Sequence, residues 1–339
     1  MTKEIKPEPL LTIDDSVHLK IIRKIAEGGM GAVYEAQQMG TEGFEKTVAI
    51  KIMLSKLVKK QFSDLFIAEA KLVANLVHEN IVQIYQLGRT SAGYYIVMEY
   101  VNGTSLANFI SYHRTLNIPF PEELAVFIIS RIARGLAYAH KREDAQGNFL
   151  AIVHRDVCPA NIMITTEGLP KLADFGVAKA AKRALPGDGM FVGKILYMAP
   201  EQAQKKPVDY RADVFSLGAV LFELLSYQTI RKIDKKTTTT NAGKLAVKEI
   251  PWDFLPNSTT EELRAILRSM MALNPKDRYQ DTDILAHDLE YYIYQKGYGP
   301  TIQTLERYLR TRFTYLYLKQ NEKNGTSLTD STTVAHFPK

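Results

Sequence analysis

The hydrophobic pattern of the chain changes near residue 100, and this change limits the fold more than any other feature. Residues 18–53 alternate short apolar runs with glycines, which indicates a hairpin followed by a third strand. Two further apolar runs, at 81–87 and 94–100, indicate two more strands. The first third of the chain is therefore expected to form a small antiparallel sheet.

Helical periodicity marks the remaining apolar segments. One helix is expected at 62–77, where a single face carries Phe62, Phe66, Val73 and Leu76. The second half contains long apolar segments at helical spacing, at 122–140, 212–226, 261–273 and 284–295. The irregular stretch 99–106, which contains Gly103, is the expected hinge. The sequence predicts an α+β protein of two lobes, a small β-rich N-lobe with one helix and a larger, mainly helical C-lobe.

The polarity of the two ends sets the expected boundaries. Residues 1–14 are predicted to be a flexible leader and residues 320–339 a disordered tail, because both are polar. The main domain is expected at 15–296, with an N-lobe at about 15–100 and a C-lobe at about 104–296. Residues 297–319 are predicted to be a helical extension, whose apolar face comprises Ile302, Leu305, Leu309 and Phe313. We expect this face to pack on the C-lobe, with docking of a partner as the alternative.

Composition narrows the function classes. The chain of 339 residues is 46% hydrophobic and 24% charged, as in soluble globular proteins. The net charge of +6 is not concentrated in a dense basic run, so we expect no nucleic-acid partner. No apolar stretch is long enough for a membrane span, and a single cysteine fits a reducing compartment. A cytoplasmic location is expected, and the sequence does not indicate an oligomeric state.

A glycine-rich segment, AEGGMGAV at 26–33, lies between two expected strands. Glycines allow backbone N–H groups to approach an anion because no Cβ stands in the way. Gly28 and Gly31 could therefore serve a phosphate-binding loop. A simple hairpin turn is the alternative for this segment on its own.

A lysine and a glutamate occupy positions where charge is costly. Lys51 ends the apolar strand VAIK, and Glu69 falls on the apolar face of the helix at 62–77, between Phe66 and Val73. A carboxylate on a buried face is unfavourable unless it is paired. We therefore predict that Glu69 pairs with Lys51.

Two polar motifs follow in the second half, HRDVCPAN at 154–161 and DFG at 174–176. Apolar runs flank the first motif, so its polar residues are expected between buried segments. The combination of Asp156, Asn161 and Asp174 in these motifs is highly specific, and chance does not explain it.

With VAIK, HRDVCPAN, DFG and MAPEQ in this order, residues 18–296 resemble a eukaryotic-type protein kinase domain, most like those of bacterial serine/threonine kinases. The resemblance implies binding of ATP and Mg²⁺, with Mn²⁺ as the alternative ion. It implies Asp156 as the catalytic base and Asn161 and Asp174 as metal ligands. Lys51 would contact the α- and β-phosphates, oriented by Glu69.

The same resemblance implies a nucleotide site. Met98 would be the gatekeeper, and the backbone of Glu99 and Val101 would meet the adenine. The family pattern Gly-x-Gly-x-x-Gly-x-Val fits Gly28, Gly31 and Val33, whereas Ala26 replaces the first glycine. The full set of expected nucleotide-binding residues is Ala26, Glu27, Gly28, Gly31, Val33, Ala49, Lys51, Met98, Glu99 and Val101.

Two structural roles also follow from the resemblance. Glu201 of MAPEQ should pair with Arg278, and Asp213 should tie the apolar helix at 212–226 to the catalytic loop.

The chain departs from the family pattern at two paired positions. Cys158 stands where serine/threonine kinases have a lysine, and Lys194 stands where they usually have a threonine. We hypothesise that Lys194 supplies the positive charge that Cys158 lacks. A solvent-facing lysine is the alternative.

A third departure concerns the segment from Asp174 to Lys194, which contains no Ser, Thr or Tyr. Family members with an arginine at the position of Arg155 usually bind a phosphate there. We predict that activity does not require phosphorylation of this segment, and that an acidic residue such as Asp188 stands in.

These features predict an active protein kinase that phosphorylates Ser/Thr hydroxyls of unidentified protein substrates. The alternative is a nucleotide-binding pseudokinase or signalling scaffold, which Ala26 and Cys158 would favour. A small-molecule kinase is disfavoured, because MAPEQ and the following helix resemble the peptide-docking part of protein kinases.

Overall fold

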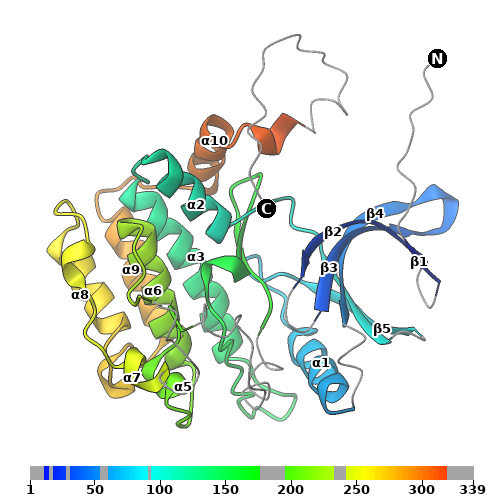
Figure 1. Ribbon diagram of the computed structural model, residues 1–339, viewed down its shortest axis with the longest axis horizontal. Helices are drawn as coiled ribbons and strands as arrows, with labels where there is room; N and C mark the ends of the chain where they lie inside the picture. Colours follow the sequence, from blue (N-terminus) through cyan, green and yellow to red (C-terminus); the bar gives the residue numbers. More distant parts are fainter. Residues whose placement is uncertain are drawn as a thin grey trace.

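The computed structural model describes residues 18–27, 31–53, 60–90, 93–175, 195–232 and 242–318, and the backbone of Leu11–Asp14. At several positions of helix α1, Glu69 among them, only the backbone is described. Two lobes lie side by side (Figure 1), a sheet with one helix and a larger bundle of helices. The predicted α+β, two-lobed architecture is confirmed.

The N-lobe is built on an antiparallel sheet of strand order β1-β2-β3-β4-β6-β5. Its strands are β1 (Leu11–Asp14), β2 (His18–Glu27), β3 (Gly31–Met39), β4 (Glu45–Met53), β5 (Ile84–Thr90) and β6 (Gly93–Glu99). Helix α1 (Lys60–Val73) packs against β5 and β6. It ends before Leu76, which is buried in the turn that follows rather than in the helix.

The side chains of β4 alternate between the two faces of the sheet and pack in two different hydrophobic cores. Val48 and Ile50 pack with the apolar residues of β2, β3 and β6 on one face. Met53 packs on the other face with Phe66 of α1. Because side chains alternate along a strand, Ala49 and Lys51 share the face of Met53. This placement turns Lys51 toward α1 and the C-lobe.

One predicted boundary is wrong. Leu11–Asp14 is not part of a flexible leader, because it forms β1 and pairs with β2 in the register Leu11↔Ile21 to Asp14↔His18. Its sequence, LTID, alternates apolar and polar residues as a half-buried strand does. Four residues give too short a pattern to recognise without the partner strand.

The C-lobe consists of helices around one large core and a small sheet of strand order β7-β8-β9. The helices are α2 (Leu106–Leu116), α3 (Glu122–His140), α5 (Pro200–Ala203), α6 (Arg211–Ser226), α7 (Ala242–Ala246), α8 (Glu261–Met270), α9 (Thr282–Tyr294) and α10 (Ile302–Arg312). The strands are β7 (Gly103–Ser105), β8 (Ile162–Thr165) and β9 (Pro170–Leu172). Single 3-10 turns form at Thr41–Gly43 in the N-lobe and at Pro159–Asn161, Trp252–Phe254 and Pro275–Asp277 in the C-lobe.

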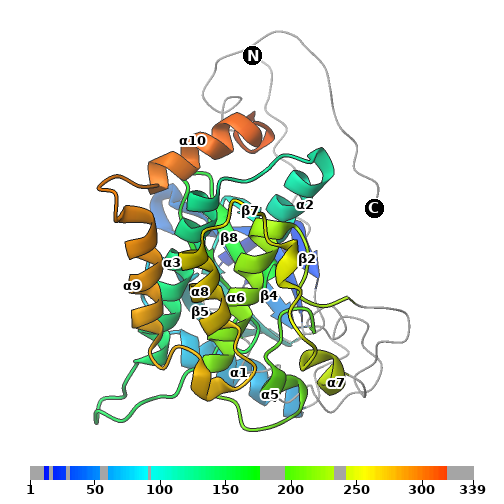
Figure 2. The same cartoon turned by 90° about the vertical axis from the view of Figure 1, so that its left-hand side faces the viewer.

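Helix α6 is the centre of the C-lobe. All of its residues from Ala212 to Leu225 are buried, including Asp213 and Glu223. A helix that is apolar on all sides must be surrounded by protein, and Figure 2 shows α6 between its neighbouring helices. Buried carboxylates on such a helix need fixed partners, and these partners build the site described next.

Candidate active site

The predicted catalytic loop, the HRDVCPAN segment at 154–161, lies between α3 and β8, and Asp213 of α6 binds its first two residues. The Asp213 carboxylate accepts hydrogen bonds from the backbone N–H groups of His154 and Arg155, each at 2.7 Å. It also contacts His140 Nε2 at 3.0 Å. Three donors around one fully buried carboxylate offset its desolvation. The predicted role of Asp213 in tying α6 to the loop is confirmed.

These bonds hold the backbone in an unfavourable conformation. Arg155 has a φ of 63°, in the left-handed region that non-glycine residues seldom adopt. Asp174 also has a positive φ, 58°. Left-handed residues of this kind persist where surrounding bonds impose them, and they concentrate at functional sites.

His154 connects the loop to the segment before Asp174. Its Nδ1 accepts a hydrogen bond from the N–H of Asp156 at 3.2 Å, and its Nε2 lies 3.0 Å from the carbonyl of Ala173. A nitrogen that accepts carries no proton, so His154 is neutral with its proton on Nε2. The ring is fully buried and lies 4.6 Å from the ring of Phe175. His154 thereby fixes the spacing between the two predicted catalytic segments.

Asp156 and Asn161 face each other within the loop. Asn161 Nδ2 donates to the carbonyl of Asp156 at 2.7 Å and to its Oδ2 at 2.8 Å. With both donors of the amide directed at Asp156, Asn161 Oδ1 is left as the oxygen that can approach a cation. Asp156 is 8% exposed, so its carboxylate can be reached from only a small part of the surface.

Lys51 and Asp174 meet across the two lobes. Lys51 Nζ lies 2.8 Å from Asp174 Oδ1, although the residues are 123 positions apart. The Lys51 side chain is 7% exposed and that of Asp174 30%. The ammonium group of Lys51, from β4, and the carboxylate of Asp174, which follows β9, therefore lie side by side.

The donor set in this region fits a hard divalent cation. Asp174 offers a carboxylate and Asn161 an amide oxygen, and Mg²⁺ is commonly held by one or two protein oxygens plus phosphate oxygens. No group of three or more His, Cys, Asp or Glu residues among the described residues could hold a metal by itself. The site thus suits a cation that arrives with a phosphate ligand.

Four predicted residues cannot be fully placed. Gly28 and Lys194 lie outside the described residues, as does Asp188, and only the backbone of Glu69 is described, within α1. The proposed Lys51–Glu69 pair and the exchange between Cys158 and Lys194 therefore remain predictions.

The glycine-rich segment begins as expected. Ala26 pairs with Val33 and Glu27 with Ala32, so the described residues of the segment form the paired ends of β2 and β3. A Cβ on Gly31 would lie 2.4 Å from the carbonyl oxygen of Ile52. Packing of β3 on β4 thus already requires a glycine at position 31, whether or not a phosphate lies nearby.

The predicted nucleotide-binding residues of the hinge come together with Lys51. Ala49 pairs with Met98, and Lys51 pairs with Ile96, on neighbouring strands. The N–H of Glu99 donates to the carbonyl of Gln83 at 2.8 Å, which makes this N–H unavailable to a ligand. Val101 is partly exposed just after β6. A cavity of about 20 Å³ is lined by Lys51, Val73, Val82, Ile84, Ile96, Met98, Leu172, Asp174 and Phe175.

One buried ion pair was not predicted. Lys171 of β9 lies 2.9 Å from Glu99 Oε1 at the end of β6. The Lys171 side chain is only 10% exposed. The sequence does contain a signal for this pair, because Lys171 lies inside the apolar run PKLADF. A charged side chain in a buried segment is costly unless it is paired, as for Glu69.

The predicted pair of Glu201 and Arg278 is confirmed. Arg278 donates from both terminal nitrogens to Glu201, at 2.7 and 2.8 Å, and its side chain is fully buried. Gln202 Nε2, next to Glu201, donates to the carbonyl of Arg155 at 3.2 Å. The segment 199–204 is thereby attached both to the catalytic loop and to the base of the C-lobe.

A second buried arginine anchors residues 195–198. Arg231 donates to the carbonyls of Ile195, Met198 and Ala246. Burial lowers the pKa of Arg231 to about 10, whereas three carbonyl acceptors favour the charged form. The guanidinium is therefore charged at neutral pH.

Tyr197 lies near Cys158, which is half-buried. The Tyr197 hydroxyl donates to Glu223 Oε2 at 2.5 Å, and Arg114 approaches the other oxygen of Glu223 at 2.8 Å. Burial, and then the negative charge of Glu223, raise the pKa of Tyr197 far above its ordinary value. The phenol is neutral and held by its bond to Glu223.

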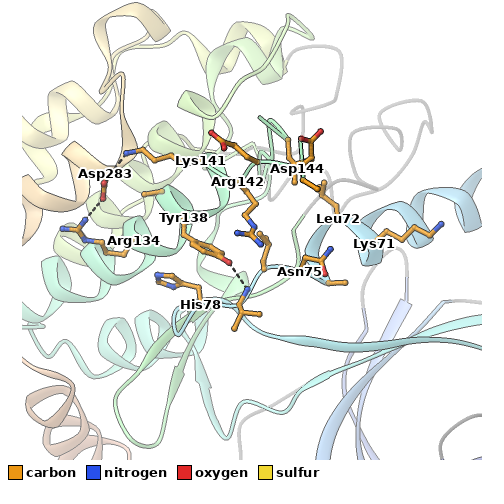
Figure 3. A pocket seen from close by; sticks show the side chains of 17 residues that line it. Lys71, Leu72, Asn75, His78, Arg134, Tyr138, Lys141, Arg142, Asp144 and Asp283 are labelled. Carbon is orange, nitrogen blue, oxygen red and sulfur yellow. Dashed lines mark hydrogen bonds and ion pairs between the residues drawn. The ribbon is translucent and has the colours of Figure 1, made fainter. Parts of the chain in front are cut away.

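A larger groove, of about 1460 Å³, lies away from these residues, between the end of α1 and the end of α3. In Figure 3 Arg134 and Lys141 both reach Asp283, and the backbone N–H of Val77 donates to the Tyr138 hydroxyl at 3.3 Å. None of the predicted catalytic residues lines this groove. It lies where the end of α1 approaches the end of α3, away from the predicted catalytic residues.

Among the helices that the structure describes, none has the length and apolar character needed to cross a bilayer.

The chain is similar in sequence to known bacterial protein kinases. The tyrosine-protein kinase MasK of Myxococcus xanthus is 38% identical over 299 residues, 86% of this chain and 46% of MasK. The serine/threonine-protein kinase PrkC of Bacillus subtilis is 33% identical over 274 residues, 80% of this chain and 40% of PrkC. The chain thus spans less than half the length of these curated relatives.

A solved structure shows the same fold. The PknI kinase domain of Mycobacterium tuberculosis superposes with a TM-score of 0.60 at 23% identity, covering 80% of this chain and 95% of that domain. The family model described as "Protein kinase domain" matches residues 19–289. The chain therefore belongs to the protein kinase family.

Proposed function

We propose that this chain is an ATP- and Mg²⁺-dependent protein kinase that transfers the γ-phosphate to Ser/Thr hydroxyls of proteins. The observation that carries the proposal is the contact between Lys51 and Asp174 across the lobes, at 2.8 Å. A phosphate chain with its metal ion presents both negative and positive charge. Lys51 can bind the negative phosphates, and Asp174 beside it can bind the positive metal ion.

Each residue has a distinct task in this reaction. Lys51 binds the α- and β-phosphates, while Asp174 and Asn161 Oδ1 would hold Mg²⁺, which neutralises phosphate charge when bound. The hydroxyl oxygen of the protein substrate forms a bond to the γ-phosphorus, and the bond between this phosphorus and the leaving ADP oxygen breaks. Asp156 accepts the proton of that hydroxyl. The hydrogen bonds from Asn161 Nδ2 hold the Asp156 carboxylate in place.

Transfer of labelled phosphate from ATP to a generic protein substrate such as casein tests the proposal. Asp156→Asn should lower kcat by about 10²–10⁴-fold, because it removes the base and keeps the shape of the side chain. The Tyr298→Phe variant, at a position 96% exposed, should be as active as the wild type. A wild-type protein that binds ATP without transferring phosphate would favour the alternative, a nucleotide-binding scaffold. Ala26 and Cys158, which both depart from the family pattern, motivate that alternative.

The class of acceptor needs its own test. Serine/threonine specificity is supported by PrkC, whereas MasK is named a tyrosine-protein kinase. Peptides that differ only in carrying Ser, Thr or Tyr at one position separate the two. Labelling confined to the Tyr peptide would overturn the proposed specificity.

We also propose a cytoplasmic location. The single cysteine, which fits a reducing compartment, supports it. Fractionation of cells that contain the whole protein, followed by immunoblotting, tests it.

A further inference from the structure

The residues after α9 lie beyond the stretch 19–289 that the family model matches. They nevertheless pack tightly on the C-lobe, since Leu305, Leu309 and Phe313 are fully buried. The ring of Phe313 stacks on that of Phe109 in α2, with centroids 5.0 Å apart and planes 10° apart. In both Figure 1 and Figure 2, α10 lies at the same end of the C-lobe as α2. We call residues 300–318 the C-terminal clamp.

The C-terminal clamp holds the turn that connects β8 to β9. The hydroxyl of Tyr317, a residue 7% exposed, donates to the carbonyl of Thr166 at 2.7 Å. Gly168 in the same turn has a φ of +85°, and a Cβ there would lie 2.3 Å from the carbonyl oxygen of Ile302. Both the backbone conformation and the close approach of α10 therefore require glycine at position 168.

Thr166 also joins this turn to the end of the hinge. Its N–H donates to the carbonyl of Asn102 at 2.8 Å, and its hydroxyl accepts from Asn102 Nδ2 at 3.3 Å. Asn102 directly follows Val101, the last residue predicted to meet the nucleotide. Tyr317 thus fastens a point where the hinge and the β8–β9 hairpin meet.

The opposite end of this hairpin carries the two predicted metal ligands. Ile162 pairs with Leu172, Asn161 directly precedes β8, and Asp174 follows β9 after one residue. The strands have four and three residues, so the turn and the ligands belong to one short, hydrogen-bonded unit. A shift of the turn is passed on to both ligands, because a paired hairpin moves as a body.

We propose that the C-terminal clamp is a positioning element of the kinase site, with Tyr317 as the residue that sets the β8–β9 hairpin and, through it, Asn161 and Asp174. The assignment of Asn161 and Asp174 as metal ligands rests on the proposed function. The hold of Tyr317 on the hairpin does not.

Tyr317→Phe in the full chain tests the proposal. It removes the hydroxyl and keeps the ring, which the guanidinium of Arg310 covers at 4.4 Å. The apparent KM for Mg²⁺ at fixed ATP should rise about threefold to tenfold. This rise is smaller than the one expected on losing a group that hydrogen-bonds a metal ligand directly, because Tyr317 acts through the hairpin. At saturating Mg²⁺, kcat should stay near the wild-type value. Gly168→Ala is a second variant, which presses on the turn from α10 and should shift the KM in the same direction.

Amide hydrogen exchange gives a readout that does not depend on activity. Exchange within residues 162–172 should be about fivefold to tenfold faster in Tyr317→Phe, as expected when a buried carbonyl loses its donor. Tyr298→Phe is the matched control, because Tyr298 is 96% exposed. It should leave both the exchange and the Mg²⁺ dependence unchanged.

Several outcomes would overturn the proposal. Wild-type Mg²⁺ dependence in both Tyr317→Phe and Gly168→Ala would do so, even with a lowered melting temperature, because the clamp would then be structural only. Faster exchange limited to Thr166–Leu169, without a change at Ile162 or Leu172, would also overturn it. If the wild type transfers no phosphate, the proposed function fails, and hydrogen exchange alone decides whether Tyr317 positions the hairpin.

Discussion

The Lys171 ammonium lies 2.9 Å from the Glu99 carboxylate, so a largely buried ion pair joins β9 to the end of β6. Glu99 Oε2 also accepts from the N–H of Gln83 at 3.2 Å. Lys171 is three residues before Asp174, and Glu99 is in the expected hinge. The pair therefore connects the strand that precedes a predicted metal ligand to the strand expected to meet the adenine.

Lys171→Met should lower the free energy of unfolding by about 1.5–3 kcal/mol, the usual loss for a hydrogen bond to a charged group. Glu99 would keep only its backbone donor in a poorly solvated position. Urea denaturation measures the change. Lys276→Met removes an exposed lysine of the same lobe and should change stability by no more than about 0.5 kcal/mol. Equal effects of the two substitutions would show that the Lys171–Glu99 pair contributes nothing.

Lys194→Met should lower kcat by about 10²–10³-fold if Lys194 replaces the cation absent at Cys158. Steady-state kinetics with a protein substrate measures it. Lys182→Met, in the same segment, is the matched control and should leave kcat unchanged. Adding Cys158→Lys to the Lys194→Met variant should restore part of the rate. A Lys194→Met enzyme as fast as the wild type would end the hypothesis.

Phosphatase treatment should leave the activity unchanged. No Ser, Thr or Tyr occurs between Asp174 and Lys194, and the hydroxyl of nearby Tyr197 is held by Glu223. Mass spectrometry before and after treatment, together with kinetics, measures the outcome. Loss of activity together with loss of a phosphate from Tyr197 would contradict the prediction.

Acid should destabilise the packing between α2 and α10 through His113. His113 is fully buried among aromatic rings, and burial holds its pKa below the ordinary value of 6.5. Its Nδ1 donates to the carbonyl of Ile118 at 3.2 Å, while its Nε2 has no hydrogen-bond partner among the described residues. Below about pH 6.5 the unfolded chain therefore takes up a proton that the folded protein resists.

The free energy of unfolding should consequently decrease as the pH falls from about 6.5 to 5, and less steeply in His113→Gln than in the wild type. Urea denaturation at a series of pH values gives the slopes. His287→Gln, at an exposed position, should retain the wild-type slope. Identical slopes for all three proteins would exclude His113 as the source.

Local patterns in the sequence predicted the helices well where the apolar period was long. The segment 122–140 is α3, residue for residue, because two glutamates occupy its first turn and an unbroken apolar stripe follows. Of the four apolar residues expected on the inward face of the C-terminal helical extension, Leu305, Leu309 and Phe313 are fully buried, whereas Ile302 is 37% exposed. The helix predicted at 62–77 extends past the observed end of α1 at Val73, because Leu76 is buried without being helical.

The sequence predicted less of the candidate site than of the helices. Asp156, Asn161 and Asp174 could be named because their motifs are specific. The contacts of Lys51 with Asp174 and of Lys171 with Glu99 join residues 123 and 72 positions apart, and no local pattern encodes them. Gly31 is among the residues expected to bind the nucleotide, with a hairpin turn as the alternative for its segment. The structure shows that strand packing also requires glycine there, because a Cβ would lie too close to the carbonyl oxygen of Ile52.

The sequence by itself determined the two lobes and their main helices and strands, and it singled out Asp156, Asn161 and Asp174 as the candidate catalytic and metal-binding residues. It could do so because hydrophobic period and short motifs are local properties. Only the tertiary structure decided which distant groups meet. It paired Leu11–Asp14 with β2, brought Lys171 to Glu99 and placed Tyr317 on Thr166. Such contacts depend on how whole elements pack, and packing is set by the sum of many side chains rather than by the residues that touch.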